Sequence, residues 1–251
     1  MTRISIPEFL ILTLLSLILF AVPALATPQK SDAKARKTQP AKPVMTGDEI
    51  VEARELLGHL GYWVVLEKRE PDDSLYHALV AFQKIERRAI TGKLTKDELQ
   101  ALRNATRPEP LEWGYNHIEV DLVRQVLFVV DCCGAILRIL PISSGSGELF
   151  TEGGWTRRAI TPIGRFKITR QIKGWRKSPL GLLYYPNYFT NGIAIHGNPA
   201  VPTFPASHGC VRIPMFAAKE FSDMATVGMP VVVHDGKVPP ALEKPLAKLE
   251  H

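Results

Sequence analysis

The sequence has few cysteines and, beyond one N-terminal stretch, no long apolar run. Its three cysteines are an odd number, so at least one thiol has no partner within the chain. Outside residues 9–26 no segment is apolar and long enough to predict a second membrane span. Apolar residues make up 45% and charged residues 22%, which argues against global disorder and against fibrous folds. Twenty prolines and eighteen glycines indicate many turns rather than an all-helical bundle.

The positive charge is concentrated in one segment. The chain holds 31 Lys and Arg against 25 Asp and Glu, a net charge of +6. Residues 27–44 carry one acidic residue, Asp32, and five basic ones: Lys30, Lys34, Arg36, Lys37 and Lys42. Because this excess lies in a Pro-, Lys- and Ala-rich stretch, we interpret it as a solvated linker or one close to an anionic surface. We expect no nucleic-acid partner.

The N-terminus has the three parts of a secretory signal peptide. A basic start at Arg3 precedes an apolar run over residues 9–26, which ends in the small residues Ala24 and Ala26. The sequence therefore predicts a signal peptide over residues 1–26, a linker over 27–44 and a location in the periplasm or cell envelope. An uncleaved membrane anchor is the alternative, because the run is about as long as the shortest membrane span. Membrane contact is expected only through this segment.

Residues 45–104 predict three short helices. Thr46 and Thr95 each precede a Glu by three residues, which is the capping box of a helix start, and Asp72 follows a proline at a third start. Apolar residues then recur at helical spacing. His59 and His77 lie within this pattern and are interpreted as surface or boundary residues. We find no nucleophile or metal-ligand set in this region.

Short strings in this region resemble the peptidoglycan-binding domain 1 family. They are Leu60-Gly61-Tyr62, Leu79-Val80-Ala81-Phe82-Gln83 and Ile90-Thr91-Gly92-Lys93-Leu94. The resemblance implies a three-helix module over residues 45–104 that attaches the protein to the cell wall or positions substrate. Residues 105–114 are then a linker.

From residue 115 the pattern changes to that of strands. Apolar and polar residues alternate over 117–130 and again over 136–142, which predicts a β-hairpin. Residues 165–169, 193–195 and 231–233 are predicted strands, and 214–225 is the one convincing helix. The fold class is therefore α+β, with a small helical module followed by a β-rich domain over 115–235. Residues 147–155 are interpreted as a loop, and 236–251 as an extended or disordered Pro-rich tail.

Two neighbouring segments hold the residues with catalytic chemistry: Ile195-His196-Gly197 and Ser207-His208-Gly209-Cys210-Val211-Arg212. A cysteine needs a base or a positive charge nearby to become a thiolate at neutral pH. His196 and His208 offer the base, and Arg212 offers the charge. Gly209 permits a tight turn, so that amides near Cys210 could face a developing oxyanion.

Three other readings of these residues are open. His196, His208 and Cys210 could bind zinc, although no paired-ligand spacing supports a metal and we expect none. The histidines could be ordinary core residues. Cys210 could form a disulfide with Cys132 or Cys133. A bond between the adjacent cysteines would close a strained ring, so we interpret that pair as small residues in a hairpin turn, which leaves Cys210 as a free thiol.

The second segment resembles the signature of the L,D-transpeptidase catalytic domain, also called the YkuD family. The resemblance extends to Ile118–Leu122, Pro141–Gly145 and Thr161–Phe166. It implies that Cys210 is the nucleophile and that His196 is the proton donor and acceptor. The backbone carbonyl of Gly197 would orient the His196 ring. The segment 147–155 and the vicinal cysteines depart from the family pattern.

The resemblance also implies roles for the residues around the nucleophile. His208 would act in or beside an oxyanion hole, with the turn at Gly209. Arg212 would organise the site or bind a substrate carboxylate, and Ser207 is assigned to substrate binding. The implied fold is sandwich-like, with the cysteine at the mouth of a groove.

The family acts on peptidoglycan stem peptides and needs no cofactor. The cysteine attacks the carbonyl of the third stem residue and releases the terminal D-Ala. The acyl group then passes to an amine of another stem, to a lipoprotein lysine or to water. The expected function is an L,D-transpeptidase. A hydrolase of the same fold and a non-catalytic wall-binding protein are the alternatives.

Overall fold

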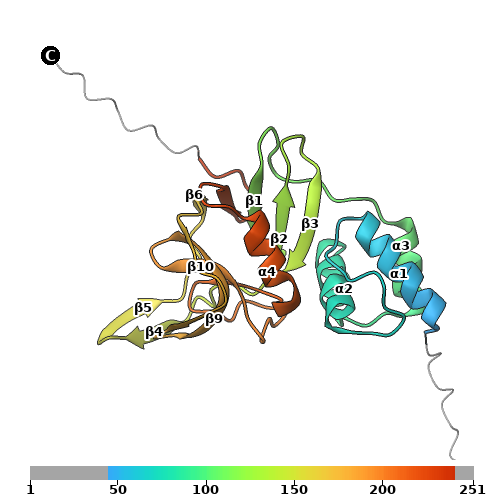
Figure 1. The fold of residues 1–251 in the computed structure, drawn as a ribbon, viewed down its shortest axis with the longest axis horizontal. Helices are drawn as coiled ribbons and strands as arrows, with labels where there is room; N and C mark the ends of the chain where they lie inside the picture. Colours follow the sequence, from blue (N-terminus) through green and yellow to red (C-terminus); the bar gives the residue numbers. More distant parts are fainter. Residues whose placement is uncertain (1–44, 241–251) are drawn as a thin grey trace, which may run out of the picture. The chain divides into compact units, whose positions relative to one another are not determined.

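The computed structural model describes residues 45–240, so the predicted signal peptide, the basic linker and most of the Pro-rich tail lie outside the described residues. Within this range the chain forms a layered α+β structure (Figure 1). Its helices are α1 (Gly47–His59), α2 (Asp73–Ile85), α3 (Lys96–Asn104) and α4 (Met215–Met224). None of the helices in residues 45–240 combines the length and the hydropathy needed to cross a bilayer.

Most of the strands form two sheets. The first has the order β3-β2-β1-β12-β6, with β1 (His117–Asp121) and β12 (Pro230–His234) parallel. Its other strands are β2 (Val126–Val130), β3 (Ile136–Pro141) and β6 (Gly164–Lys167). The second sheet has the order β11-β10-β9-β7, and β8 pairs with β9. Its strands are β7 (Arg170–Gln171), β8 (Trp175–Ser178), β9 (Gly181–Thr190), β10 (Ile193–Gly197) and β11 (Val211–Ile213).

The helix starts predicted from the caps are observed. The Thr46 hydroxyl accepts the Glu49 amide at 3.3 Å, and the Glu49 carboxylate accepts the Thr46 amide at 2.9 Å. The Thr95 hydroxyl accepts the Glu98 amide at 3.1 Å, and Asp72 caps α2. Each cap satisfies an amide that has no partner inside its helix, which is why short polar residues fix these starts.

Strand β2 is buried on both faces. Leu127 and Val129 face the core between the two sheets. Apolar side chains of α4 pack into the same core. Val126, Phe128 and Val130 face the opposite way, into a core shared with α1, α2 and α3. Because side chains alternate along a strand, β2 supplies both cores at once.

The three N-terminal helices therefore share a core with the first sheet. Apolar side chains of α2, including Leu79 and Phe82, belong to the same cluster as Phe128 and Ile139. Backbone bonds also join the two parts, since the Trp63 amide donates to the Ile139 carbonyl at 3.0 Å. This packing does not support a separate three-helix module, because each part covers apolar surface of the other. We call helices α1–α3 the helical layer.

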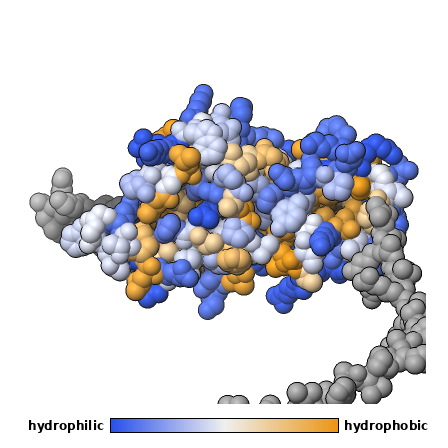
Figure 2. All heavy atoms as spheres, turned by 90° about the horizontal axis from the view of Figure 1, so that it is seen from below, coloured by the Kyte–Doolittle hydropathy of each residue, from blue (hydrophilic) through white to orange (hydrophobic). Residues whose placement is uncertain are grey.

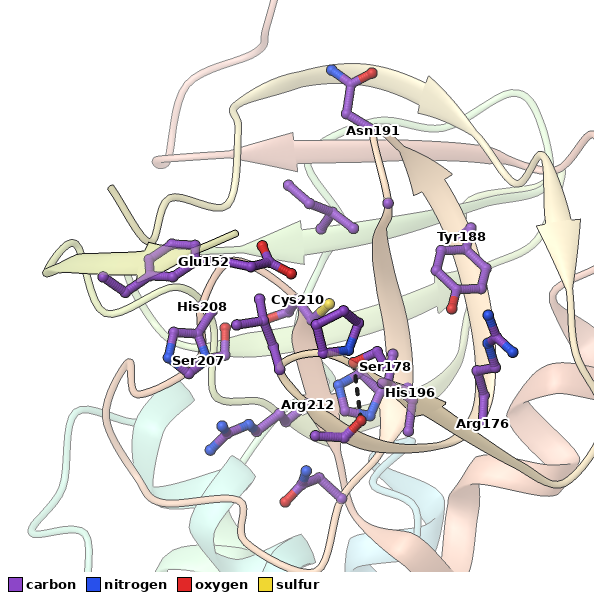
Figure 3. A pocket seen from close by; sticks show the side chains of 18 of the residues that line it. Glu152, Arg176, Ser178, Tyr188, Asn191, His196, Ser207, His208, Cys210 and Arg212 are labelled. Atoms are coloured by element: carbon purple, nitrogen blue, oxygen red, sulfur yellow. Dashed lines mark hydrogen bonds between the residues drawn. The ribbon is translucent and has the colours of Figure 1, made fainter. Parts of the chain in front are cut away.

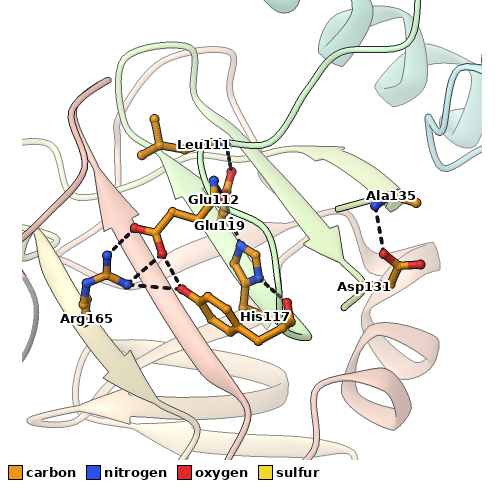
Figure 4. Close-up of polar contacts among 8 residues, drawn as sticks. Leu111, Glu112, His117, Glu119, Asp131, Ala135 and Arg165 are labelled. Carbon is orange, nitrogen blue, oxygen red and sulfur yellow. Dashed lines mark hydrogen bonds and ion pairs between the residues drawn. The ribbon is translucent and has the colours of Figure 1, made fainter. Parts of the chain in front are cut away.

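Polar and apolar residues alternate along β1, and the polar side chains are buried rather than exposed. His117 contacts the Tyr115 carbonyl at 2.7 Å and Glu119 at 3.0 Å, and both side chains are fully buried (Figure 4). The Glu119 carboxylate also accepts the amides of Leu111 and Glu112 at 2.8 and 2.7 Å. The segment before β1 is thus tied to the sheet by a buried polar network.

Two turns differ in how well the sequence predicted them. Cys132 and Cys133 lie exposed in the turn between β2 and β3, as predicted, with their sulfur atoms 3.5 Å apart. The predicted loop over 147–155 is instead largely a β-hairpin of β4 (Leu149–Glu152) and β5 (Trp155–Arg158). The side chains of this hairpin are largely exposed. Figure 2, which draws one face of the whole molecule, shows apolar side chains at the surface among hydrophilic ones.

Candidate active site

The register of β10 and β11 brings the predicted site residues together. These strands are parallel neighbours in which His196 pairs with Arg212 and Ile195 with Val211. Because side chains alternate, His196 and Arg212 share one face while Ile195 and Val211 face the core between the sheets. Cys210 lies two positions before Arg212 and is therefore on the same side as the histidine.

This face opens into a cavity of about 510 Å³. Figure 3 shows Cys210 near its middle, with His208 and Glu152 on one side and Tyr188 and Arg176 on the other. Glu152 is the one carboxylate among the described residues that line the cavity. The lining arginines are Arg157, Arg158, Arg170, Arg176 and Arg212. Such a wall attracts a ligand with negative charge.

The Cys210 thiol is a protonated group in the resting site. Among the described residues its sulfur accepts one hydrogen bond, from the Ala194 amide at 3.4 Å. The side chain packs against Leu183 and Tyr188. Burial raises the pKa of the Cys210 thiol above its ordinary value, although the Ala194 amide and the positive charge of Arg212 oppose that rise. For this sulfur to act as a thiolate, a base would have to remove its proton.

The ring of His196 is held in an orientation that suits a proton acceptor. Its Nδ1 lies 2.9 Å from the carbonyl oxygen of Gly197. Because a carbonyl only accepts, Nδ1 carries a proton, and the neutral ring has its lone pair on Nε2. Burial lowers the pKa of His196 to about 4; the bond to Gly197 opposes this shift and the charge of Arg212 adds to it. The ring is thus neutral at pH 7 and can accept a proton.

The turn before Cys210 is held by its own side chains. The Ser207 hydroxyl donates to the Cys210 carbonyl and accepts the Gly209 amide at 3.0 Å. Ser207 is buried, so its hydroxyl serves the turn. The Thr161 hydroxyl donates to the Gly209 carbonyl at 2.7 Å. These bonds fix the backbone from which the Cys210 side chain projects.

Gly209 is required by this geometry. Its φ is +129°, a region that residues with a side chain rarely adopt. A Cβ added there would lie 2.9 Å from the carbonyl oxygen of Ile160. Gly197 has a packing reason of its own, since a Cβ there would lie 2.6 Å from the Cβ of Ala218 in α4.

His208 occupies the rim rather than the buried part of the site. It is exposed, and its ring centroid lies 4.8 Å from that of Phe150 in β4. Both residues also line a second cavity of about 240 Å³. His208 therefore stands between the two cavities, beside the hairpin.

Sequence reasoning missed several residues that line the main cavity. Arg176 and Tyr188 reach it through the pairing of β8 and β7 with β9, and no local motif marks them. The hairpin that contributes Phe150 and Glu152 did have a signal. Two consecutive glycines follow Glu152, and a Gly-Gly pair between two short strands is typical of a tight hairpin turn.

The alternative readings fare differently against the structure. Cys210 is free, as are the other two cysteines. Within residues 45–240 no three His, Cys, Asp or Glu side chains are arranged to hold a metal ion. His196 and Cys210 line a cavity rather than the core between the sheets, which does not favour a purely structural role for the histidine.

Comparison with known proteins gives a consistent family. Residues 115–233 match the family model of the L,D-transpeptidase catalytic domain, YkuD. A crystal structure of an L,D-transpeptidase from Xylanimonas cellulosilytica is 34% identical, with a TM-score of 0.71, over 78% of this chain and 98% of that one. This likeness covers more of the chain than the family match does.

A more distant solved structure is an L,D-transpeptidase from Stackebrandtia nassauensis. It is 20% identical, with a TM-score of 0.44, over 80% of this chain and 98% of that one. Comparison with curated proteins gives no match.

Proposed function

The chain belongs to the L,D-transpeptidase family, and we propose that it transfers the acyl group of a peptidoglycan stem peptide through a thioester on Cys210. The observation that carries the proposal is the shared face of Cys210, His196 and Arg212, on which the bond to Gly197 leaves the Nε2 of His196 free to accept a proton. Family membership alone would not identify the reacting atoms.

In the first half-reaction the Cys210 sulfur attacks the carbonyl carbon of the third stem residue. Its proton passes to Nε2 of His196, and the negative charge develops on the carbonyl oxygen. When the intermediate collapses, the bond to the terminal D-Ala nitrogen breaks. That nitrogen takes the proton from His196 and leaves as an amine, and a thioester remains on Cys210.

In the second half-reaction an acceptor amine attacks the thioester and restores the thiol. His196 removes the proton from the amine and returns one to the sulfur. The acceptor is an amine of a second stem, which gives a 3→3 cross-link, or a lysine of a lipoprotein. Attack by water instead would make the protein a hydrolase, which is the second candidate function.

The residues around the sulfur fit this chemistry in supporting roles. The turn held by Ser207 and Gly209 presents the sulfur and backbone amides to the carbonyl oxygen. His208 at the rim would contact substrate or the developing oxyanion. Arg212 and the other arginines of the cavity would bind the stem-peptide carboxylates.

The proposal extends to the rest of the chain. We place the protein in the periplasm or cell envelope because of the signal peptide that the first 26 residues predict. The helical layer would bind the wall and bring the cavity close to its substrate, as the resemblance of residues 45–104 implies. No cofactor or metal enters the steps above.

Incubation with purified disaccharide-tetrapeptide, followed by mass spectrometry, tests the proposal. A cross-linked dimer with loss of D-Ala supports the transpeptidase. Tripeptide alone identifies the hydrolase. Unchanged substrate, from a protein with a cooperative unfolding transition, would exclude both reactions on this substrate and favour a wall-binding role.

A further inference from the structure

We call residues 207–212, which carry Cys210, the nucleophile turn, and residues 143–146 the clamp segment. The nucleophile turn is hydrogen-bonded along one side to the clamp segment. The Ser143 amide donates to the Arg212 carbonyl at 3.1 Å, and the Arg212 amide donates back to Ser143 at 3.0 Å. The Ser144 carbonyl accepts the Ser207 amide at 2.9 Å, and the Ser146 amide donates to the Ser207 carbonyl at 2.9 Å. The position of Cys210 thus depends on where the clamp segment lies.

The side chain of Gln125 holds the clamp segment from the other side. Its amide nitrogen donates to the Ser144 hydroxyl at 2.8 Å, and its amide oxygen accepts the Ser144 backbone N–H at 3.0 Å. The backbone carbonyl of Gln125 also accepts the Ile142 amide at 2.9 Å. Gln125 is buried and has a φ of +54°, so the turn between β1 and β2 is shaped around these contacts.

A lysine of the helical layer reaches this junction. Lys84 lies on α2 with 6% of its surface exposed, and its Nζ donates to the carbonyls of Gln125 at 2.9 Å and Ile142 at 3.2 Å. Within residues 45–240 it forms no ion pair with a carboxylate. Burying an ammonium group among neutral acceptors is unfavourable, and an apolar side chain would fill the same space at less cost.

We propose that Lys84 is a positioning residue for the active site: by joining α2 to the carbonyls of Gln125 and Ile142, it fixes the clamp segment on which the nucleophile turn rests. Lys84 does not line the cavity that holds Cys210, and it acts through Gln125 and Ser144. The inference rests on the proposed function, because the position of the turn matters for activity only if Cys210 is the nucleophile.

Two variants break the connection at different points of the full-length chain. Lys84→Met keeps the apolar stem but removes the donors, and Gln125→Leu removes the side-chain bridge to Ser144 while leaving α2 unchanged. The control is Leu99→Val, which alters the packing of the helical layer without changing the contacts of Lys84, and Tm is measured for every variant. Leu99 is buried in the helical layer, and its neighbours are apolar.

We expect Lys84→Met to lower kcat on disaccharide-tetrapeptide by about tenfold or more, since a misplacement near 1 Å can cost roughly 100-fold. KM should change by less than about twofold, because the cavity wall is untouched. Alkylation of Cys210 by iodoacetamide, followed by peptide mass mapping, should become faster because a loosened turn exposes the sulfur. The Leu99 control should show neither change.

Gln125→Leu should give the same pair of effects, and the double variant should be no worse than either single one, because both act on one connection. If Lys84→Met does not fold, the kcat and the alkylation rate of Gln125→Leu alone test whether the clamp segment positions Cys210. Unchanged kcat and unchanged alkylation in whichever variant folds would overturn the proposal, as would equal changes in the Leu99 control. If the wild type makes no product from tetrapeptide, the proposed function fails, and the alkylation rates still decide whether Lys84 positions the turn.

Discussion

Arg54 in the helical layer and the side chains of Cys210 and His196 differ in how many hydrogen-bond partners they have. In the helical layer the fully buried Arg54 donates to the carbonyls of Val65 and Glu70, both at 2.7 Å, and to the Asp72 carboxylate at 2.9 Å. At the site the side chains of the half-buried Cys210 and the buried His196 each have a single protein partner among the described residues. Groups with many partners stabilise a fold, whereas groups with few remain available to react.

The same contrast appears in the protonation states. The pKa of the Asp72 carboxyl is held far below its ordinary value: burial opposes this, but bonds from Lys68, Leu75 and Arg54 outweigh it. At the site burial dominates, so the pKa of Cys210 is raised and that of His196 falls to about 4. The resting pair is a thiol and a neutral imidazole. The Arg54–Asp72 pair thus holds its charges, whereas Cys210 and His196 rest in their neutral forms.

The largest expected effect separates activity from stability. Cys210→Ala should abolish turnover of disaccharide-tetrapeptide while leaving the Tm within a few degrees of wild type, because the lost thiol makes one weak hydrogen bond. Product analysis by mass spectrometry and a thermal melt measure the two quantities. Undiminished turnover in the variant would place the nucleophile elsewhere.

Removal of the helical layer should damage both regions together. A chain that begins at Glu109 exposes the apolar face of the first sheet, where each buried Val, Ile or Phe contributes about 1.5–3 kcal/mol. We therefore expect loss of the cooperative urea transition and loss of turnover on soluble tetrapeptide as well as on intact sacculi. Normal turnover on tetrapeptide with a loss confined to sacculi would instead show that the layer is only a tether.

A matched change within the helical layer should have little effect. Arg103→Gln breaks an exposed ion pair with Glu52 on α1, and exposed pairs contribute little to stability. It serves as the control for the truncation, since it alters the layer without uncovering the sheet.

A smaller effect concerns acid stability. His77 lies in the helical layer and stacks on Phe216 of α4; burial lowers its pKa to about 4, with the charges of Asp73 and Lys84 acting in opposite directions. Because this value is below the unfolded value of 6.5, the unfolded state takes up the proton first. Stability is therefore full above about pH 6.5 and falls as the pH drops towards 4.

Urea midpoints measured between pH 7 and pH 5 should fall in the wild type and fall less in His77→Phe, which keeps the stacking but cannot be protonated. His59→Gln, at an exposed position of α1, is the control and should keep the wild-type slope. An unchanged slope in His77→Phe would show that other groups set the acid stability.

The smallest expected effect is at the vicinal cysteines. Cys132→Ser should leave turnover within about twofold of wild type, because the residue lies in an exposed turn with no base in contact. Treatment with EDTA should have equally little effect, since the proposed transfer by Cys210 and His196 needs no Lewis acid. Loss of turnover that zinc restores would favour the metal reading of the site.

Features fixed by neighbouring residues could be predicted from the sequence. The caps at Thr46 and Thr95 act within three residues, and the segment that holds Cys210 is a continuous string. Features fixed by distant contacts could not. Lys84 and Ile142 are far apart in sequence, and nothing near Lys84 indicates that its ammonium group meets a carbonyl of another layer.

The site itself shows the same division. The pairing of His196 with Arg212 cannot be predicted from either segment alone, although the sequence identifies both segments as carrying catalytic residue types. The burial of Glu119 contradicts the simple expectation that the polar positions of an alternating strand face water, because amides of the preceding segment cover it. Lining residues such as Tyr188 come from long strands without a motif.

The double burial of β2 has a consequence for how the molecule forms. During synthesis the helical layer appears first, with its apolar side unpartnered until the strand that completes it has been made. The core between the sheets waits for the same strand, since Leu127 and Val129 belong to it. Neither half can then reach its native packing alone, and assembly becomes a single cooperative event rather than a succession of independent domains.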